Sequence, residues 1–194
     1  MLLFQNVFDH STLMMSKKKL FEYRLKYDDS IKYAQDYELI SRAARFFPLT
    51  NIQQVLVFSR THPDQIANRY HKSQKSVTRL VQERQLNELG INPGENYLDL
   101  HGNTVTLRLP PSKKMILDTA NWLKIIKSAN DEKKVYNQDA LNRCISEMWS
   151  RVRNAYSSLG FWIWKNGRDS DLKAKENNSI FAEGKFFLKC LLKY

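Results

Sequence analysis

The sequence predicts an α/β protein in which helices predominate, with a few strands and a helix up to about residue 62 and an almost entirely helical remainder. Three observations predict this division. An apolar, β-branched run occupies residues 55–58, and apolar residues recur at helical spacing after residue 62. Gly and Pro are scarce, at 6 and 5 of 194 residues, which disfavours an all-β sandwich with many tight turns. The length suits one ordinary core, or a small domain with a helical extension.

Two strands, a short helix over residues 17–21 and a longer helix are predicted in the first sixty residues. Residues 12–15 suit a short strand, and the run 55–58 suits a strand that is buried on both faces. Between them, apolar residues at helical spacing predict a helix that opens at Asp36 and ends before Pro48.

Four helices are predicted after residue 62. Pro63 suits the first turn of the first helix, and Gly90 suits the cap at its end. In chain order the predicted helices span residues 63–89, 112–129, 137–159 and 181–194, with loops at 92–94 and 161–171.

Charge is the outlying feature of the composition. Lys and Arg number 31 against 20 Asp and Glu, a net charge of +11, which favours an anionic partner such as nucleic acid, a lipid surface or a phosphorylated substrate. The basic residues are spread along the chain without a recognised nucleic-acid-binding motif, so nucleic acid is the least favoured of these three partners.

Cys144 and Cys190 lie far apart and form no C-x-x-C pair, which fits a reducing cytoplasm rather than a disulfide framework or a zinc site. The start of the chain does not look like a signal peptide, and no apolar run is long enough to span a membrane.

Three short motifs follow one another in a set order. They are His10-Ser11-Thr12, Gln35-Asp36-Tyr37-Glu38-Leu39, and Val55-Leu56-Val57-Phe58-Ser59-Arg60-Thr61-His62 leading to Gln65-Ile66. Their order and spacing resemble the second half of family 2 glycosyltransferases over residues 1–70. The resemblance implies that residues 1–70 are the acceptor-side portion of the catalytic domain, with part of the Rossmann-like sheet of the A-type glycosyltransferase fold. Residues 71–194 then resemble the helical C-terminal extension of some bacterial members.

The resemblance also implies a reaction. Such enzymes transfer a sugar from a nucleotide-sugar donor to a saccharide or lipid-linked acceptor with inversion, here in bacterial surface polysaccharide synthesis. A carboxylate must take the proton of the acceptor hydroxyl, and the resemblance gives that role to Asp36. The start of a helix favours the ionised form that a base requires. The alternative is that Asp36 caps its helix, a common role for Asp.

Four other residues are candidates for binding substrate. Arg60 and His62 alternate along an extended segment, so both can face a diphosphate, and a neutral His62 could complete a metal site. The alternatives are an Arg–carboxylate pair and a His that caps the next helix. Gln35 stands where the family usually has Glu, so it can form hydrogen bonds but adds no charge. His10 is the weakest candidate, because a lone His near a strand is more often structural.

The nucleotide-binding half of such enzymes is not found in this sequence. In the family, an Asp-x-Asp motif ahead of the acceptor-side motifs holds a divalent metal, manganese or magnesium, on the donor diphosphate. Here Asp169-Ser170-Asp171 comes after those motifs, and no Gly-rich phosphate loop is present. We therefore expect a truncated enzyme that is inactive by itself and binds no cofactor, the metal belonging to the complete parent enzyme.

The closing helix, residues 181–194, has two interpretations. Its apolar residues alternate with Lys185, Lys189 and Lys193, which is typical of a helix that lies on a membrane surface. Packing of the same apolar face against the helical bundle is the alternative.

We expect a cytoplasmic protein that is peripheral to the inner membrane. The rival functions are a non-catalytic helical interaction module and a nucleic-acid-binding module.

Overall fold

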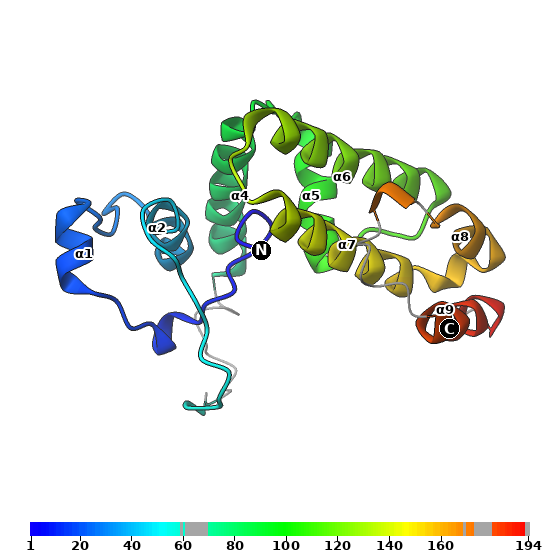
Figure 1. Cartoon of the computed structure of the whole chain (residues 1–194), viewed down its shortest axis with the longest axis horizontal. Coiled ribbons are helices and arrows are strands. Elements are labelled where there is room, and N and C mark those ends of the chain that lie inside the picture. Colours follow the sequence, from blue (N-terminus) through cyan, green and yellow to red (C-terminus); the bar gives the residue numbers. More distant parts are fainter. Residues whose placement is uncertain (59, 61–69, 169, 173–179, 193–194) are drawn as a thin grey trace. The chain divides into compact units, whose positions relative to one another are not determined.

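The computed structural model describes residues 1–58, 60, 70–168, 170–172 and 180–192 (Figure 1). The chain divides into two compact units, Met1–Arg84 and Gln85–Tyr194. Within the described residues every regular element is a helix, so the fold is all-α and the expected Rossmann-like sheet is wrong. The division into an acceptor-side portion, residues 1–70, and a helical C-terminal extension, residues 71–194, stays a prediction.

Neither predicted strand forms in the described part of the chain. Thr12 ends the short 3-10 helix η1 (His10–Thr12), and residues 13–15 follow it without regular structure. The side chains of residues 55–58 are between 48% and 94% exposed, and none of the backbone hydrogen bonds found among the described residues involves them. A strand is stable only beside a second strand, because its backbone hydrogen bonds lie outside itself. The described residues contain no second strand with which residues 55–58 could pair, so their β-branched side chains do not produce a strand there.

Unit 1 is built on two short helices and the first part of a longer one. These are α1 (Lys17–Glu22), α2 (Gln35–Ala43) and α4 (His71–Glu88). Ser16 starts α1, because its side chain accepts a hydrogen bond from the backbone N–H of Lys19. A small apolar core joins α1 to α2; its buried members are Leu25, Leu39 and Ala43, and Met15, Leu20, Tyr23, Tyr27 and Phe47 pack against them.

The N-terminal segment is tied to both α2 and α4. The hydroxyl of Tyr37 donates to the carbonyl of Leu2, and the side-chain amide of Gln82 donates to the carbonyl of Phe4 at 2.6 Å. These bonds hold the segment that precedes Asn6 beside the start of α2.

The end of α4 confirms the predicted glycine cap. Gly90 has φ +76°, the N–H of Ile91 bonds the carbonyl of Leu86 at 3.0 Å, and the N–H of Gly90 bonds that of Asn87 at 2.9 Å. This pair of bonds is the Schellman arrangement, which requires a left-handed residue and so favours glycine. Pro63, the predicted start of the same helix, lies outside the described residues.

Unit 2 is a helical bundle followed by shorter helices. Its elements are α5 (Glu95–Thr106), α6 (Lys113–Lys133), α7 (Gln138–Ala155), η2 (Ser157–Leu159), α8 (Phe161–Asn166), η3 (Ser170–Leu172) and α9 (Ile180–Leu192). The helices α5, α6 and α7 pack on one another (Figure 1). Ser112 and Asn137 cap α6 and α7 through their side-chain oxygens, and both helices begin where the sequence predicts. The helix α5 was not predicted, and α8 occupies a stretch predicted to be a loop.

The core of unit 2 is formed chiefly by one face of α6 and one face of α7. Fully buried residues on these faces are Ile116, Trp122, Leu123 and Ile126 of α6 and Ile145, Met148, Trp149 and Val152 of α7. In the described residues no helix combines the length and the apolar character that crossing a membrane requires.

A buried asparagine joins α5 to α7. The side-chain oxygen of Asn103 accepts from the backbone N–H groups of Arg108 at 2.8 Å and Leu109 at 2.9 Å, and its amide donates to the hydroxyl of Tyr156 at 3.0 Å. Asn103 thereby supplies an acceptor for the backbone N–H groups that follow α5, and it fixes that turn against the end of α7.

Asn103→Ala should therefore destabilise unit 2 by about 2–4 kcal/mol, because two backbone N–H groups lose their acceptor. Asn154→Ala is the matched control, since Asn154 is exposed and its loss should cost less than about 0.5 kcal/mol. All four tryptophans lie between residues 122 and 164, so urea unfolding followed by tryptophan fluorescence reports on unit 2. Equal unfolding midpoints for the two variants would contradict the role given to Asn103.

Candidate functional site

Asp36 lies in the first turn of α2 but does not cap it. The N-cap residue is Ala34, which has φ +53° and makes no side-chain cap hydrogen bond. A non-glycine residue in this left-handed region is strained, and such strain is often found near functional sites. The alternative interpretation of Asp36 as a helix cap is therefore not supported. Its carboxylate still lies at the positive end of the helix, which stabilises negative charge.

One oxygen of the Asp36 carboxylate is held by Asn6. The amide nitrogen of Asn6 donates to Oδ2 of Asp36 at 2.9 Å, and the amide oxygen of Asn6 accepts from the backbone N–H of Phe8 at 3.1 Å. Because the Phe8 bond fixes which end of the amide carries the oxygen, the nitrogen is directed at Asp36. Among the described residues, no hydrogen bond is found for the other oxygen, Oδ1, so it can accept a proton.

Tyr27 lies within electrostatic reach of this carboxylate, and His10 contacts Tyr27. The hydroxyl of Tyr27 and Nε2 of His10 are 3.0 Å apart. Burial raises the pKa of the Tyr27 phenol, and the negative charge of Asp36 raises it further. Tyr27 therefore stays protonated near neutral pH and can donate a hydrogen bond. We call Asn6, His10, Tyr27 and Asp36 the Asp36 cluster.

Two short turns position the outer members of the cluster. Oδ1 of Asp9 accepts from the hydroxyl and backbone N–H of Ser11, at 2.6 and 2.9 Å, and so starts the 3-10 helix that carries His10. Oδ1 of Asp28 makes the same pair of bonds to Ser30, at the same distances, just after Tyr27. These hydrogen bonds lower the pKa of both carboxyl groups, which is the behaviour of local turn residues.

Glu38 is the second carboxylate of the motif, and its environment is different. It is 4% exposed. Arg42 donates to its two oxygens at 2.8 and 2.7 Å, and Arg84 lies 3.5 Å from Oε1. Glu38 is thus neutralised and structural, while half-buried Asp36 receives its described hydrogen bond from a neutral amide. Residues two apart on a helix do not share a face, in keeping with these separate roles.

Four of the five predicted site residues lie in the described part of the chain. The structure places His10 against Tyr27, which is within electrostatic reach of Asp36, and Gln35 lies beside Asp36 as the half-buried first residue of α2. Arg60 is exposed outside the regular elements, and the Asp36 cluster is built without it. His62 lies outside the described residues. Sequence reasoning missed Asn6 and the role of Tyr27, because neither belongs to a motif and Asn6 is 30 residues from Asp36.

The described residues do not fit the divalent metal that the resemblance implies for the complete enzyme. They contain no group of three or more His, Cys, Asp or Glu side chains suited to hold an ion. The carboxylate of Asp171 lies 3.7 Å from the amine of Lys124, and Asp169 is outside the described residues. Cys144 and Cys190 are buried thiols outside any disulfide, and burial raises the pKa of each, which disfavours a reactive thiolate.

Comparison with known proteins gives one distant similarity. No protein-family model matches the chain, and no solved structure matches it. A protein of Haemophilus influenzae described as an uncharacterized glycosyltransferase is 27% identical to the chain over 95 residues. The matched stretch is 47% of this chain and 29% of the relative, so the chain spans less than a third of that protein. This similarity supports a glycosyltransferase as the class of enzyme to which the chain is related.

Proposed function

We propose that this chain forms the acceptor side of an inverting, family 2 glycosyltransferase in which Asp36 is the general base. The donor would be a nucleotide-sugar and the acceptor a saccharide or a lipid-linked saccharide, in the synthesis of a bacterial surface polysaccharide. The order of the sequence motifs and the glycosyltransferase-named relative support this proposal. The observation that carries it is the Asp36 carboxylate, held at Oδ2 by Asn6 at the start of α2 and open at Oδ1.

The proposed chemistry follows from that geometry. As the acceptor oxygen attacks the anomeric carbon, its proton passes to Oδ1 of Asp36. The bond from the anomeric carbon to the donor diphosphate breaks on the opposite side, and its electron pair leaves with the phosphate oxygen. The hydrogen bond from Asn6 orients the carboxylate through Oδ2 and leaves Oδ1 to accept the proton.

The other residues have supporting roles in the proposal. Tyr27, His10 and Gln35 offer polar groups around Asp36 that can position sugar hydroxyls. Arg60 and His62 would contact the donor diphosphate, where negative charge develops. No step is assigned to a metal ion.

Asp36→Asn should lower kcat by about a hundred- to ten-thousand-fold with little change in donor affinity, because general-base catalysis is worth that much. The measurement requires a complete enzyme that carries this segment, either this chain reconstituted with a nucleotide-binding half or a full-length relative with the same motif. The asparagine oxygen can still accept from Asn6, so the fold around residue 36 should persist.

The matched control for that variant is Asp29→Asn. Asp29 is an exposed carboxylate seven residues away, and the same chemical change there should leave kcat unchanged. Turnover by Asp36→Asn within a few-fold of the unmodified enzyme would remove Asp36 as the base.

Asn6→Asp should move the acidic limb of the kcat–pH profile to higher pH by at least about one unit, because a second carboxylate beside Asp36 raises the pKa of the pair. The sign follows from the role of a base, which is lost as the pH falls through its pKa, so a higher pKa brings the loss at a higher pH. Asn6→Ala separates charge from positioning, since it should lower kcat without this displacement. An unchanged pH profile for Asn6→Asp would show that residue 6 does not act on the base.

Calorimetry tests where the donor binds. The sequence has no Asp-x-Asp motif ahead of its acceptor-side motifs and no Gly-rich loop, so this chain should give no binding heat with UDP-sugars and manganese. A dissociation constant in the micromolar range would show that the chain has a donor site of its own.

A further inference from the structure

The helix α9 is apolar on two faces. Phe186 and Cys190 are buried, so one face packs against the rest of unit 2, as the bundle alternative predicts. Leu188, Leu191 and Leu192 are 57%, 53% and 66% exposed on the same helix. Because these three residues are spaced i, i+3 and i+4, they form a single outward stripe. Packing inside the protein therefore leaves a second apolar face uncovered by the described residues.

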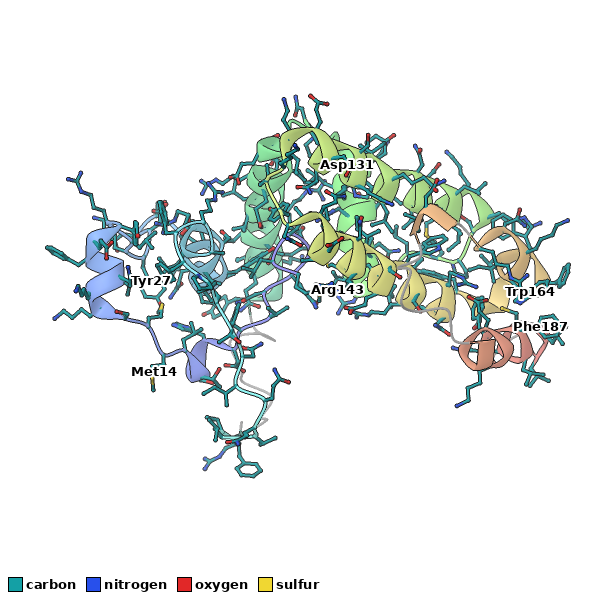
Figure 2. All side chains as sticks on the ribbon, viewed as in Figure 1. Met14, Tyr27, Asp131, Arg143, Trp164 and Phe187 are labelled. Carbon is teal, nitrogen blue, oxygen red and sulfur yellow. The ribbon has the colours of Figure 1, made fainter. Side chains whose placement is uncertain are left out.

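The uncovered face continues onto α8. The rings of Phe187 and Trp164 lie side by side (Figure 2), with their centres 4.8 Å apart. The centre of the Trp164 ring lies 5.1 Å from that of Phe161, which is 55% exposed. Phe187 follows Leu191 around the helix, since each residue turns it by about 100°. We call the six residues Phe161, Trp164, Phe187, Leu188, Leu191 and Leu192 the α8–α9 face.

An ion pair, a cation–ring contact and a hydrogen bond hold α9 against α7 and so fix the orientation of this face. Arg153, which is buried, donates to both oxygens of Glu183 at 3.0 and 3.2 Å, and its guanidinium lies 4.3 Å from the ring centre of Phe186. The amine of Lys189 donates to the carbonyl of Asn154 at 2.8 Å. These bonds join α9 to α7, so the leucines are presented outward by a held helix rather than a frayed end.

Basic residues border the α8–α9 face. Lys185 and Lys189 follow Leu192 around α9, and Lys165 and Arg168 lie at the end of α8. The guanidinium of Arg168 stacks 3.8 Å from the ring centre of Trp164. Residues 161–194 contain seven Lys or Arg against four Asp or Glu.

We propose that the α8–α9 face docks on an anionic lipid surface. Exposed leucines with aromatic rings beside them suit shallow insertion at the boundary between headgroups and acyl chains, where Trp is favoured. The basic border adds attraction to anionic headgroups, and this charge complementarity selects a membrane over an uncharged apolar partner. The α8–α9 face lies in unit 2, so the proposal does not rest on Asp36 or on sugar transfer.

Vesicle binding tests the proposal with the chain as it is. The chain should co-sediment with vesicles of phosphatidylcholine containing about a third phosphatidylglycerol, bind vesicles of phosphatidylcholine alone far less, and be released at about 0.5 M salt. The fluorescence of Trp164 should shift to the blue on binding, since its surroundings become less polar.

A double variant, Leu188→Asn with Leu191→Asn, should reduce the partition coefficient by on the order of tenfold or more, because two apolar side chains no longer insert. Leu117→Asn is the matched control; it removes a 52% exposed leucine from α6 and should bind as the unmodified chain does. Both changes are on exposed positions, and circular dichroism checks that the fold is kept.

Three results would overturn the proposal. One is equal binding to neutral and anionic vesicles, and another is an equal loss of binding in the control and the double variant. The third is a dimer seen by light scattering that the double variant abolishes, since a second copy would then cover the α8–α9 face.

Discussion

The buried carboxylate of Glu38 is the constraint on which the arrangement of unit 1 depends. A charge removed from water has to be compensated by partners with good geometry. Arg42 supplies two hydrogen bonds from the same helix and a third, at 2.7 Å, to the carbonyl of Lys26, while Arg84 approaches from α4. One ionic centre therefore joins α2, α4 and the segment that leads to Tyr27. Removing either arginine would disturb the position of the start of α2 as well as the charge.

The same helix carries two carboxylates whose environments give them opposite properties. Both oxygens of Glu38 accept from Arg42, and Arg84 adds a second cation, so its charge is compensated where it is buried. Asp36, two residues earlier, lies where the helix end and a neutral amide stabilise its charge without cancelling it. The strained backbone at Ala34 is part of this arrangement, because it turns the chain sharply into α2. Glu38 links the helices of unit 1, whereas Asp36 is the carboxylate proposed as the base.

Local signals in the sequence predicted the features that depend on neighbouring residues. Ser112, Asn137 and Gly90 mark helix ends that the structure confirms, since a cap acts within one turn. Other features depend on residues far away in the chain and could not be predicted in this way. The contact of Asn6 with Asp36 follows from the folding of the N-terminal segment against α2, and nothing in either residue's neighbourhood encodes it. The strand prediction at residues 55–58 failed for a related reason, because β-propensity describes a side chain's fit to a sheet and not the presence of one.

The exposed run at residues 55–58 makes the behaviour of this chain depend on time and concentration. Within the described residues no backbone hydrogen bond of this run is found, and such a run with exposed apolar side chains is able to add to an available sheet edge, including one formed by another copy. Any segment tethered to this chain would compete for the run at an effective concentration on the order of millimolar, far above that of free copies in a cell. Residues 55–58 can therefore pair within one assembly or between copies of the chain. Only pairing between copies depends on concentration, so dilution favours the soluble outcome.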